Sequence, residues 1–217
     1  SYAPIWKRGK DKKYKQLVQF MKTQNMGITN DNKYGTKTGY LNKKGVHPGS
    51  AARKSDNVPS LRYPLPIIRL GELYLDYAEA CVGYGDASYV AEGMKKLNVI
   101  RERAGIDPVL TAWAKAKEPL TDYSSVGPDG RLMQIVRQER MIELYMETHN
   151  FWDLRRWKEL DDMQNIYKVK VVKQTDGTIQ YTKALHATYN IQDKMYFYPI
   201  SNTELFKNHK LVQNTGW

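Results

Sequence analysis

The residues best suited to chemistry in this 217-residue chain are three glutamates at four-residue spacing, Glu139, Glu143 and Glu147. On a helix, this spacing places all three carboxyl groups along one face. Two carboxyl groups flanking a sugar bond perform glycoside hydrolysis, one as the acid and the other as the base or nucleophile. The pattern therefore raises the hypothesis of a glycoside hydrolase that uses these glutamates.

Arginines in the same part of the chain favour a structural role instead. Arg101 occupies a position of an apolar helical stripe where another apolar residue is expected. A general acid needs a raised pKa, whereas nearby guanidinium groups hold a carboxyl group ionised. We therefore predict no catalytic residue. We interpret the charged residues as a buried ion-pair network that comprises Arg101, Glu139, Glu143, Glu147, Arg155 and Arg156.

Metal and redox chemistry are not predicted. His149 is the only histidine close to these glutamates, and Glu147-Thr148-His149 lacks the Glu-x-x-His spacing of di-iron helical bundles. The single cysteine, Cys81, excludes a disulfide within the chain and a CxxC pair. We expect neither a metal nor a cofactor.

The formal net charge of +11 resides entirely in the first segment. Residues 1–63 hold 14 Lys and Arg against three acids, whereas residues 64–217 hold 20 of each sign. Aromatic residues lie among these lysines, so one hypothesis is a polyanion-binding module. We favour the alternative of a solvated or subunit-facing region rich in loops. Zinc-finger, RNP and leucine-zipper patterns are absent from the sequence, so no nucleic acid is predicted as a partner.

Two helices are predicted after this basic segment. Apolar residues recur at helical spacing over residues 67–81 and again over residues 90–97. Between them, Gly85 is a typical stop signal and Asp86 a typical N-cap, and the second helix is expected to end near Ala104. The pattern predicts a helical hairpin of the tetratricopeptide-like kind.

A further helix is predicted over about residues 131–148. It is apolar on nearly every side, so we expect it to be central and buried. Residues 167–172 and 178–182 have strand character around a turn at Asp176, and residues 195–200 are a candidate for another strand. The predicted fold is mainly α, with a helical hairpin, a central buried helix, long loops and a small β-hairpin.

Three segments, in this order, resemble the C-terminal portion of the SusD/RagB family, the nutrient-binding lipoproteins of Bacteroidetes outer membranes. They are PIIRLGELYLDYAEACVGYGD, LNVIRERAGI and RQERMIELYMETHNFWDLRRWK. The resemblance covers about residues 38–217, and the third segment is its specific part. One departure is Thr148-His149-Asn150, where the family commonly has Gly-His-Arg. We divide the chain into a basic segment, 1–63, and a SusD/RagB-like helical domain, 64–217.

The resemblance implies capture without catalysis. Family members hold an oligosaccharide, or less often a peptide, at the outer-membrane surface as a lid over a SusC-like TonB-dependent transporter, which takes the nutrient inward. It also implies that the family's N-terminal half, with its lipidated cysteine, is missing from this chain and is one of its partners. The glutamates and arginines named above then belong to the scaffold.

Sugar binding requires flat aromatic faces together with planar polar groups. Aromatic residues outside the family segments are the candidates to stack on a sugar ring, namely Trp6, Tyr40, Trp113 and Tyr123. Because the first segment is both basic and aromatic, we also predict a weak preference for acidic glycans.

Overall fold

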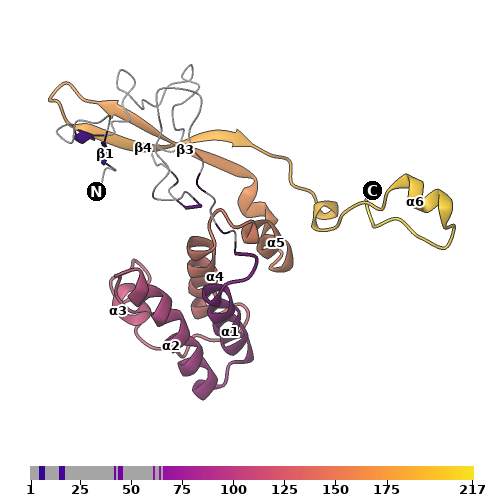
Figure 1. Cartoon of the computed structure of the whole chain (residues 1–217), viewed down its shortest axis with the longest axis horizontal. Helices are drawn as coiled ribbons and strands as arrows, with labels where there is room; N and C mark the ends of the chain where they lie inside the picture. Colours follow the sequence, from indigo (N-terminus) through magenta and orange to yellow (C-terminus); the bar gives the residue numbers. More distant parts are fainter. Residues whose placement is uncertain are drawn as a thin grey trace. The chain divides into compact units, whose positions relative to one another are not determined.

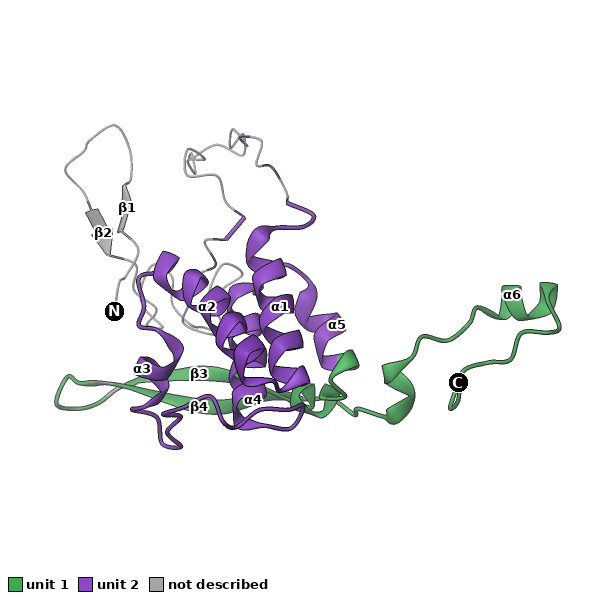
Figure 2. Cartoon of the chain, turned by 90° about the horizontal axis from the view of Figure 1, so that it is seen from below, with its two compact units in different colours: residues 1–43, 155–217 green, residues 44–154 purple. Residues whose placement is uncertain are grey.

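The computed structural model describes residues 66–217 and, before them, only Ile5–Lys7, Lys15–Leu17, Asn42, Lys44, Gly45, Leu61 and Pro64. The chain divides into two compact units (Figure 2). We refer to residues 44–154 as the helical unit, and to residues 1–43 with 155–217 as the hairpin unit. The boundary predicted between residues 63 and 64 stays a prediction, because most residues before it lie outside those described.

The helical unit is built on a hairpin of α1 and α2, and α4 packs on α1 (Figure 1). Its helices are α1 (Leu70–Tyr84), α2 (Ala87–Arg103), α3 (Val109–Trp113), α4 (Arg131–Glu143) and α5 (His149–Arg156), the last of which ends in the hairpin unit. The predicted mainly α fold and the helical hairpin are confirmed. None of the helices in the described part of the chain is both long and apolar enough to cross a bilayer.

The turn between α1 and α2 forms as its residues predict. Gly85 follows α1 with φ of 83°, a left-handed conformation that favours glycine. The Asp86 carboxylate accepts hydrogen bonds of 2.9 and 3.4 Å from two backbone N–H groups in the first turn of α2. Farther along α2, a Cβ atom at Gly93 would lie 2.9 Å from Cβ of Cys81 and 3.1 Å from Cα of Ala78. The two helices therefore pack closely because position 93 has no side chain.

The core lies where α1, α2 and α4 meet. Its fully buried aliphatic side chains include Leu75, Val82, Val90, Met94, Leu97, Leu132, Ile135 and Val136. The apolar stripe predicted for the first helix is wrong in part, since Ile67, Leu70 and Leu73 are exposed. The helix is apolar on two separate faces, and helical periodicity alone does not decide which face is buried.

α4 is shorter than predicted, because it ends at Glu143 instead of continuing to Thr148. The carbonyl oxygen of Glu143 accepts hydrogen bonds from Lys44 Nζ at 2.7 Å and Arg69 Nη2 at 2.8 Å. In a longer helix, this oxygen would accept a hydrogen bond from a backbone N–H of the next turn, and here the two side chains donate to it instead. α4 is also not buried all round, since Ile142 is exposed.

The corner between α4 and α5 has an unusual backbone. Met146 and Thr148 have φ angles of 63° and 70°, in the left-handed region that residues other than glycine rarely adopt. Glu147 lies between them, and its side chain is held by two cations, as described below. Backbone strain of this kind persists where the surrounding contacts impose it.

We expect Thr148→Gly to be more stable than Thr148→Ala by about 0.5–1 kcal/mol, because glycine adopts this φ without a steric cost. Both variants lose the threonine hydroxyl, so the comparison isolates the backbone. Urea unfolding followed by circular dichroism measures the difference. At Gln138, an exposed position inside α4, the order of the same two substitutions should reverse. An alanine variant that is the more stable at both positions would contradict the assignment of strain.

The hairpin unit contains the predicted β-hairpin, formed by the antiparallel strands β3 (Asn165–Lys173) and β4 (Ile179–Thr188). At its turn, the Asp176 carboxylate accepts a 2.8 Å hydrogen bond from the backbone N–H of Thr178, and Gly177 has φ of 86°. The strand predicted over residues 195–200 is wrong. The 3₁₀ helix η2 (Asp193–Tyr196) includes the first two of these residues, and the other four form no strand. The remaining elements of this unit are β1 (Ile5–Lys7), β2 (Lys15–Leu17), the 3₁₀ helix η1 (Leu160–Met163) and α6 (Asn202–Lys207).

Candidate functional site

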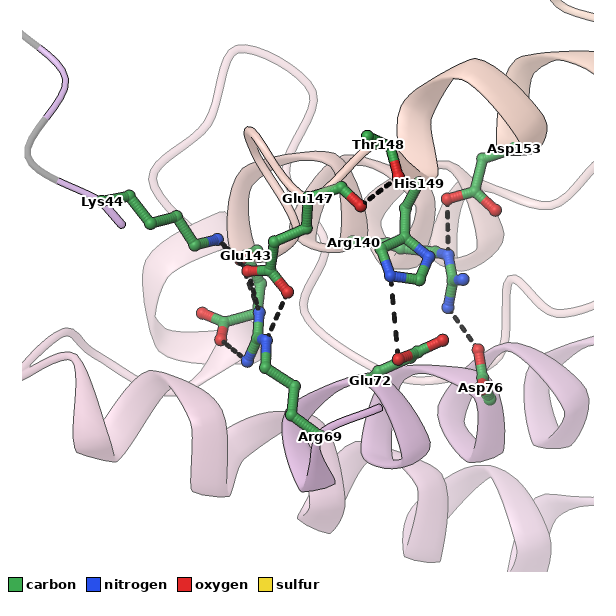
Figure 3. Close-up of polar contacts among 10 residues, drawn as sticks. All are labelled: Lys44, Arg69, Glu72, Asp76, Arg140, Glu143, Glu147, Thr148, His149 and Asp153. Atoms are coloured by element: carbon green, nitrogen blue, oxygen red, sulfur yellow. Dashed lines mark hydrogen bonds and ion pairs between the residues drawn. The ribbon is translucent and has the colours of Figure 1, made fainter. Parts of the chain in front are cut away.

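Several charged side chains of the helical unit converge where α1 approaches the end of α4 and the start of α5 (Figure 3). We call this cluster the charged junction. α1 and its N-cap supply Arg69, Glu72 and Asp76, whose i, i+3, i+7 spacing places them on one face. The other members are Lys44, Arg103, Arg140, Glu143, Glu147, His149 and Asp153.

Arg69 holds two of the three glutamates first singled out. Its Nη1 donates to Glu143 at 2.6 Å, while its Nε and Nη2 donate to the two carboxylate oxygens of Glu147 at 2.6 and 2.9 Å. Lys44 forms a second ion pair with Glu147, and Arg103 Nη2 donates to Glu143 at 2.5 Å. The fork of one arginine therefore ties the start of α1 to the corner after α4.

These cations keep both carboxyl groups ionised. Burial by itself would raise the pKa of Glu143, but hydrogen bonds from Arg103 and Arg69 outweigh burial and lower that pKa. The pKa of Glu147 is lowered in the same way by Arg69 and Lys44. A carboxyl group with a lowered pKa is a poor proton donor near neutral pH, so neither residue suits the acid role of a glycosidase.

Glu139 lies apart from the junction, in a buried ion pair with Arg101. Arg101 also donates from Nε to the carbonyl oxygen of Asp107 at 2.5 Å. Burial raises the pKa of Glu139, although Arg101 and a hydrogen bond with the Trp113 side chain oppose this shift. Glu139 is only 8% exposed, so its carboxylate is out of reach of a polysaccharide.

Arg140 is a buried member of the junction that was not among the residues predicted for the ion-pair network. Its Nε donates to Asp153 at 2.7 Å, and its Nη1 pairs with Asp76 of α1. Burial would lower the pKa of Arg140, but these two carboxylates raise it. The signal was available, since Leu132, Val136 and Arg140 recur at four-residue spacing. A charge again extends an apolar stripe, as at Arg101.

Arg155 and Arg156 contact aromatic rings in the hairpin unit. The Arg155 guanidinium lies 5.8 Å from the ring centre of Tyr198, and that of Arg156 lies 4.7 Å from the ring centre of Trp157.

At the charged junction, His149 Nε2 lies 3.7 Å from the Glu72 carboxylate. Among the residues that the structure describes, no group of three or more His, Cys, Asp or Glu side chains is placed to hold a metal ion.

Two of the four candidate sugar-stacking residues are described. Trp113 and Tyr123 are partly buried and pack against the core of the helical unit. The Arg131 guanidinium lies 5.2 Å from the Trp113 ring centre. Tyr40 and the side chain of Trp6 lie outside the described residues. A role in ligand binding remains a prediction for all four.

Comparison with known proteins decides the family. The SusD family model matches residues 2–217. The chain belongs to the SusD family. A SusD-like protein of Bacteroides ovatus is 27% identical over 194 residues, which cover 76% of this chain and 32% of that protein. The crystal structure of a SusD-like protein from Bacteroides fragilis is similar with a TM-score of 0.54 and 26% identity, over 74% of this chain and 29% of that chain.

The chain thus spans about a third of the length of these two SusD-like proteins. The resemblance to the SusD family found in the sequence is confirmed. Its first and third segments supply most of the charged junction, because Arg69, Glu72 and Asp76 lie in the first and residues 137–158 form the third. The most specific part of the SusD pattern therefore coincides with the ion pairs between α1, α4 and α5.

The lowered pKa values of Glu143 and Glu147 predict a loss of stability in acid. Both groups favour the folded state above their unfolded pKa, and this contribution is lost as the pH falls through their folded values. Glu139 has the opposite sign, because its folded pKa is raised. The part of the free energy of unfolding that Glu143 and Glu147 contribute should therefore fall as the pH drops from about 4.5, the ordinary glutamate pKa, through their lowered folded values.

Glu147→Gln tests this assignment, because it removes one of the two responsible groups. The variant should be less stable at neutral pH and should lose less stability on acidification, as measured by urea unfolding at several pH values. Glu204→Gln, in an exposed ion pair of α6, is the control and should leave the pH profile unchanged. A Glu147→Gln profile parallel to that of the parent protein would contradict the prediction.

Proposed function

We propose that the protein captures a glycan, or another nutrient, at the bacterial outer-membrane surface without changing it chemically and passes it to a SusC-like TonB-dependent transporter. The match of the SusD family model to residues 2–217 carries this proposal. The surroundings of the three glutamates support it, because cations of the charged junction hold Glu143 and Glu147 ionised, and Glu139, outside the junction, is buried. We further propose that a lipid anchor in another part of the polypeptide holds the protein at the surface.

A glycan microarray probed with the full-length protein tests binding, and calorimetry with the best glycan gives the affinity. We expect binding together with an unchanged glycan after prolonged incubation. Release of new reducing ends, abolished by a glutamate substitution that leaves the fold intact, would establish the hydrolase alternative. Co-purification from native membranes tests the transporter partner, and proteolysis of intact cells tests surface exposure.

The basic first segment favours acidic glycans as ligands, since residues 1–63 hold 14 cationic side chains against three acids. We expect somewhat tighter binding to sulfated or uronate-rich glycans than to neutral ones at low salt. Equal affinities for the two classes would reject this preference. Binding to random duplex DNA with a steep salt dependence, and no binding to glycans, would instead support the polyanion-binding alternative.

Among the candidate stacking residues, Trp6 and Tyr40 are the two that we would substitute to test sugar binding. Trp113 and Tyr123 pack against the core, so their substitution also affects stability. We expect Trp6→Ala or Tyr40→Ala to weaken glycan affinity, and the melting temperature of each variant serves as the control for its fold. Unchanged affinity in both variants would remove these residues from the binding site.

A further inference from the structure

The β-hairpin of β3 and β4 presents its side chains to solvent on both faces. None of the side chains that the structure describes in these two strands is buried. Tyr167, Tyr181 and Leu185 are 45%, 66% and 54% exposed. The two strands form an extended two-stranded ribbon (Figure 1). Exposed aromatic side chains on such a ribbon are accessible to a ligand.

Three of these side chains form a row along one face of the hairpin. Tyr181, Lys183 and Leu185 alternate along β4, so their side chains point to the same face. Tyr167 of β3 is paired with Leu185 and belongs to this face as well. At about 3.4 Å per residue, Lys183 lies about 7 Å from Tyr181 along the strand, and the Tyr167 level lies about 14 Å from it. We call Tyr167, Lys183 and Tyr181 the hairpin track.

Tyr167 fixes the position of the Lys183 ammonium group. Nζ of Lys183 lies 3.7 Å from the ring centre of Tyr167, which is the distance of a cation–π contact. This contact restrains a long side chain, and so reduces the conformational entropy that a ligand of Lys183 would have to remove. The track therefore places a positioned cation beside the exposed ring of Tyr181.

The hairpin as a whole is basic. Residues 165–188 hold four lysines and a single acid, Asp176. The Asp176 carboxylate is engaged in the turn, where it accepts hydrogen bonds from the backbone N–H and the hydroxyl of Thr178. Within the part of the chain that the structure describes, no carboxylate forms an ion pair with Lys168, Lys170 or Lys183. The field around the hairpin therefore favours an anionic ligand.

We propose that the hairpin track binds an acidic sugar unit of a glycan, with the apolar face of the sugar ring on Tyr181 and its carboxylate or sulfate on Lys183. An aromatic face beside a positioned polar group is the combination that sugar binding requires. Lys183 supplies a charge-assisted hydrogen bond to the anion. The inference rests on the proposed function, and it adds a binding site on β3 and β4 that is separate from the basic first segment.

The dimensions of the track favour a glycan over a protein as its ligand. The track is about 14 Å long, and the two strands that carry it are about 5 Å apart. A stable complex between separate proteins buries about 800 Å² on each partner, which is far more than this strip offers. A linear acidic polysaccharide presents ring faces and anionic groups in turn along its chain, and the track presents rings and a cation in the same way.

Calorimetry of the full-length protein with matched oligosaccharides tests the inference. The probes are a hexauronate with its carboxyl-reduced neutral form, and a sulfated hexasaccharide with its desulfated form. At low salt, we expect the parent protein to bind at least one acidic probe ~10-fold more tightly than the neutral counterpart. Lys183→Ala should bring this ratio close to one, because the ammonium group that contacts the anion is then missing.

Lys170→Ala is the matched control for charge. Lys170 is also exposed, but it is paired with Thr182 and its side chain points to the opposite face of the hairpin. The substitution removes the same charge without touching the track, so we expect at most a ~2-fold loss of affinity for the acidic probe.

The ring of Tyr181 is tested in the same titrations. Tyr181→Ala should weaken binding of the acidic probe by about 3–10-fold, whereas Tyr181→Phe keeps the ring and should retain the parent affinity. Tyr189→Ala is the matched control, because Tyr189 follows β4 and is 55% exposed. We expect Tyr189→Ala to leave the affinity unchanged.

Three results would overturn the inference. Equal losses from Lys183→Ala and Lys170→Ala would show that only the overall charge of the hairpin matters. Parent affinity in Tyr181→Ala, or no binding of either acidic probe by the parent protein, would exclude the track as a sugar site. Loss of transporter co-purification in Lys183→Ala at unchanged glycan affinity would assign the hairpin to a protein interface instead. The glycan microarray reports binding of other glycans independently, so failure of this inference is distinguishable from failure of the proposed function.

Discussion

Replacing Arg140 with methionine is expected to destabilise the helical unit by about 3–5 kcal/mol. Arg140 and Asp153 are 5% and 3% exposed, and the substitution removes from the buried Asp153 carboxylate the charge and the hydrogen bond that Arg140 supplies. It also breaks the ion pair that joins α4 to Asp76 of α1. Urea unfolding followed by circular dichroism at neutral pH measures the loss, which should appear as a lower midpoint with a similar slope.

Arg103→Met is the matched control. Arg103 also pairs with a carboxylate of the junction, Glu143, but its side chain is 59% exposed. An exposed ion pair contributes at most about 1 kcal/mol, because water and salt screen it. Equal losses from the two substitutions would show that burial does not set the strength of the Arg140 contacts. The double variant Arg140→Met with Asp153→Asn should recover part of the loss, because both members of the buried ion pair are then neutral.

Replacing Glu139 with glutamine is expected to cost at most about 3 kcal/mol, because it leaves the buried Arg101 guanidinium without a counter-charge. Burial raises the pKa of Glu139 although Arg101 opposes this shift, so a neutral glutamine avoids part of the desolvation cost and the loss should be smaller than for Arg140→Met. Thermal unfolding of the helical unit measures the effect. The substitution also separates a scaffold from an enzyme, because a catalytic carboxyl group is replaceable without loss of stability.

Glu204→Gln provides the comparison for this substitution as well. Glu204 pairs with Lys207 at 2.8 Å, but both side chains are more than half exposed. We expect no measurable change in its melting temperature. If Glu139→Gln retained the parent melting temperature while a glycan-cleaving activity disappeared, the scaffold interpretation would be wrong.

Much of the candidate site was visible in the sequence as charges where a core is expected. Arg101 and Glu139 interrupt apolar stripes, and the structure brings these two together in a buried pair. Arg140 was not predicted as a member of the network, although it interrupts an apolar stripe in the same way. The partners of Glu143 and Glu147 could not be deduced, because Lys44 and Arg69 lie outside the helix that carries the glutamates.

The sequence by itself determined the local elements of this protein. The caps at Gly85 and Asp86 and the hairpin turn at Asp176 depend on contacts between residues a few positions apart, so the residue types suffice to predict them. Tertiary structure decided where α4 ends, through donors 74 and 99 residues away from Glu143 in the chain. It also decided which apolar face of α1 is buried, because both faces satisfy helical periodicity and only packing against α2 and α4 distinguishes them.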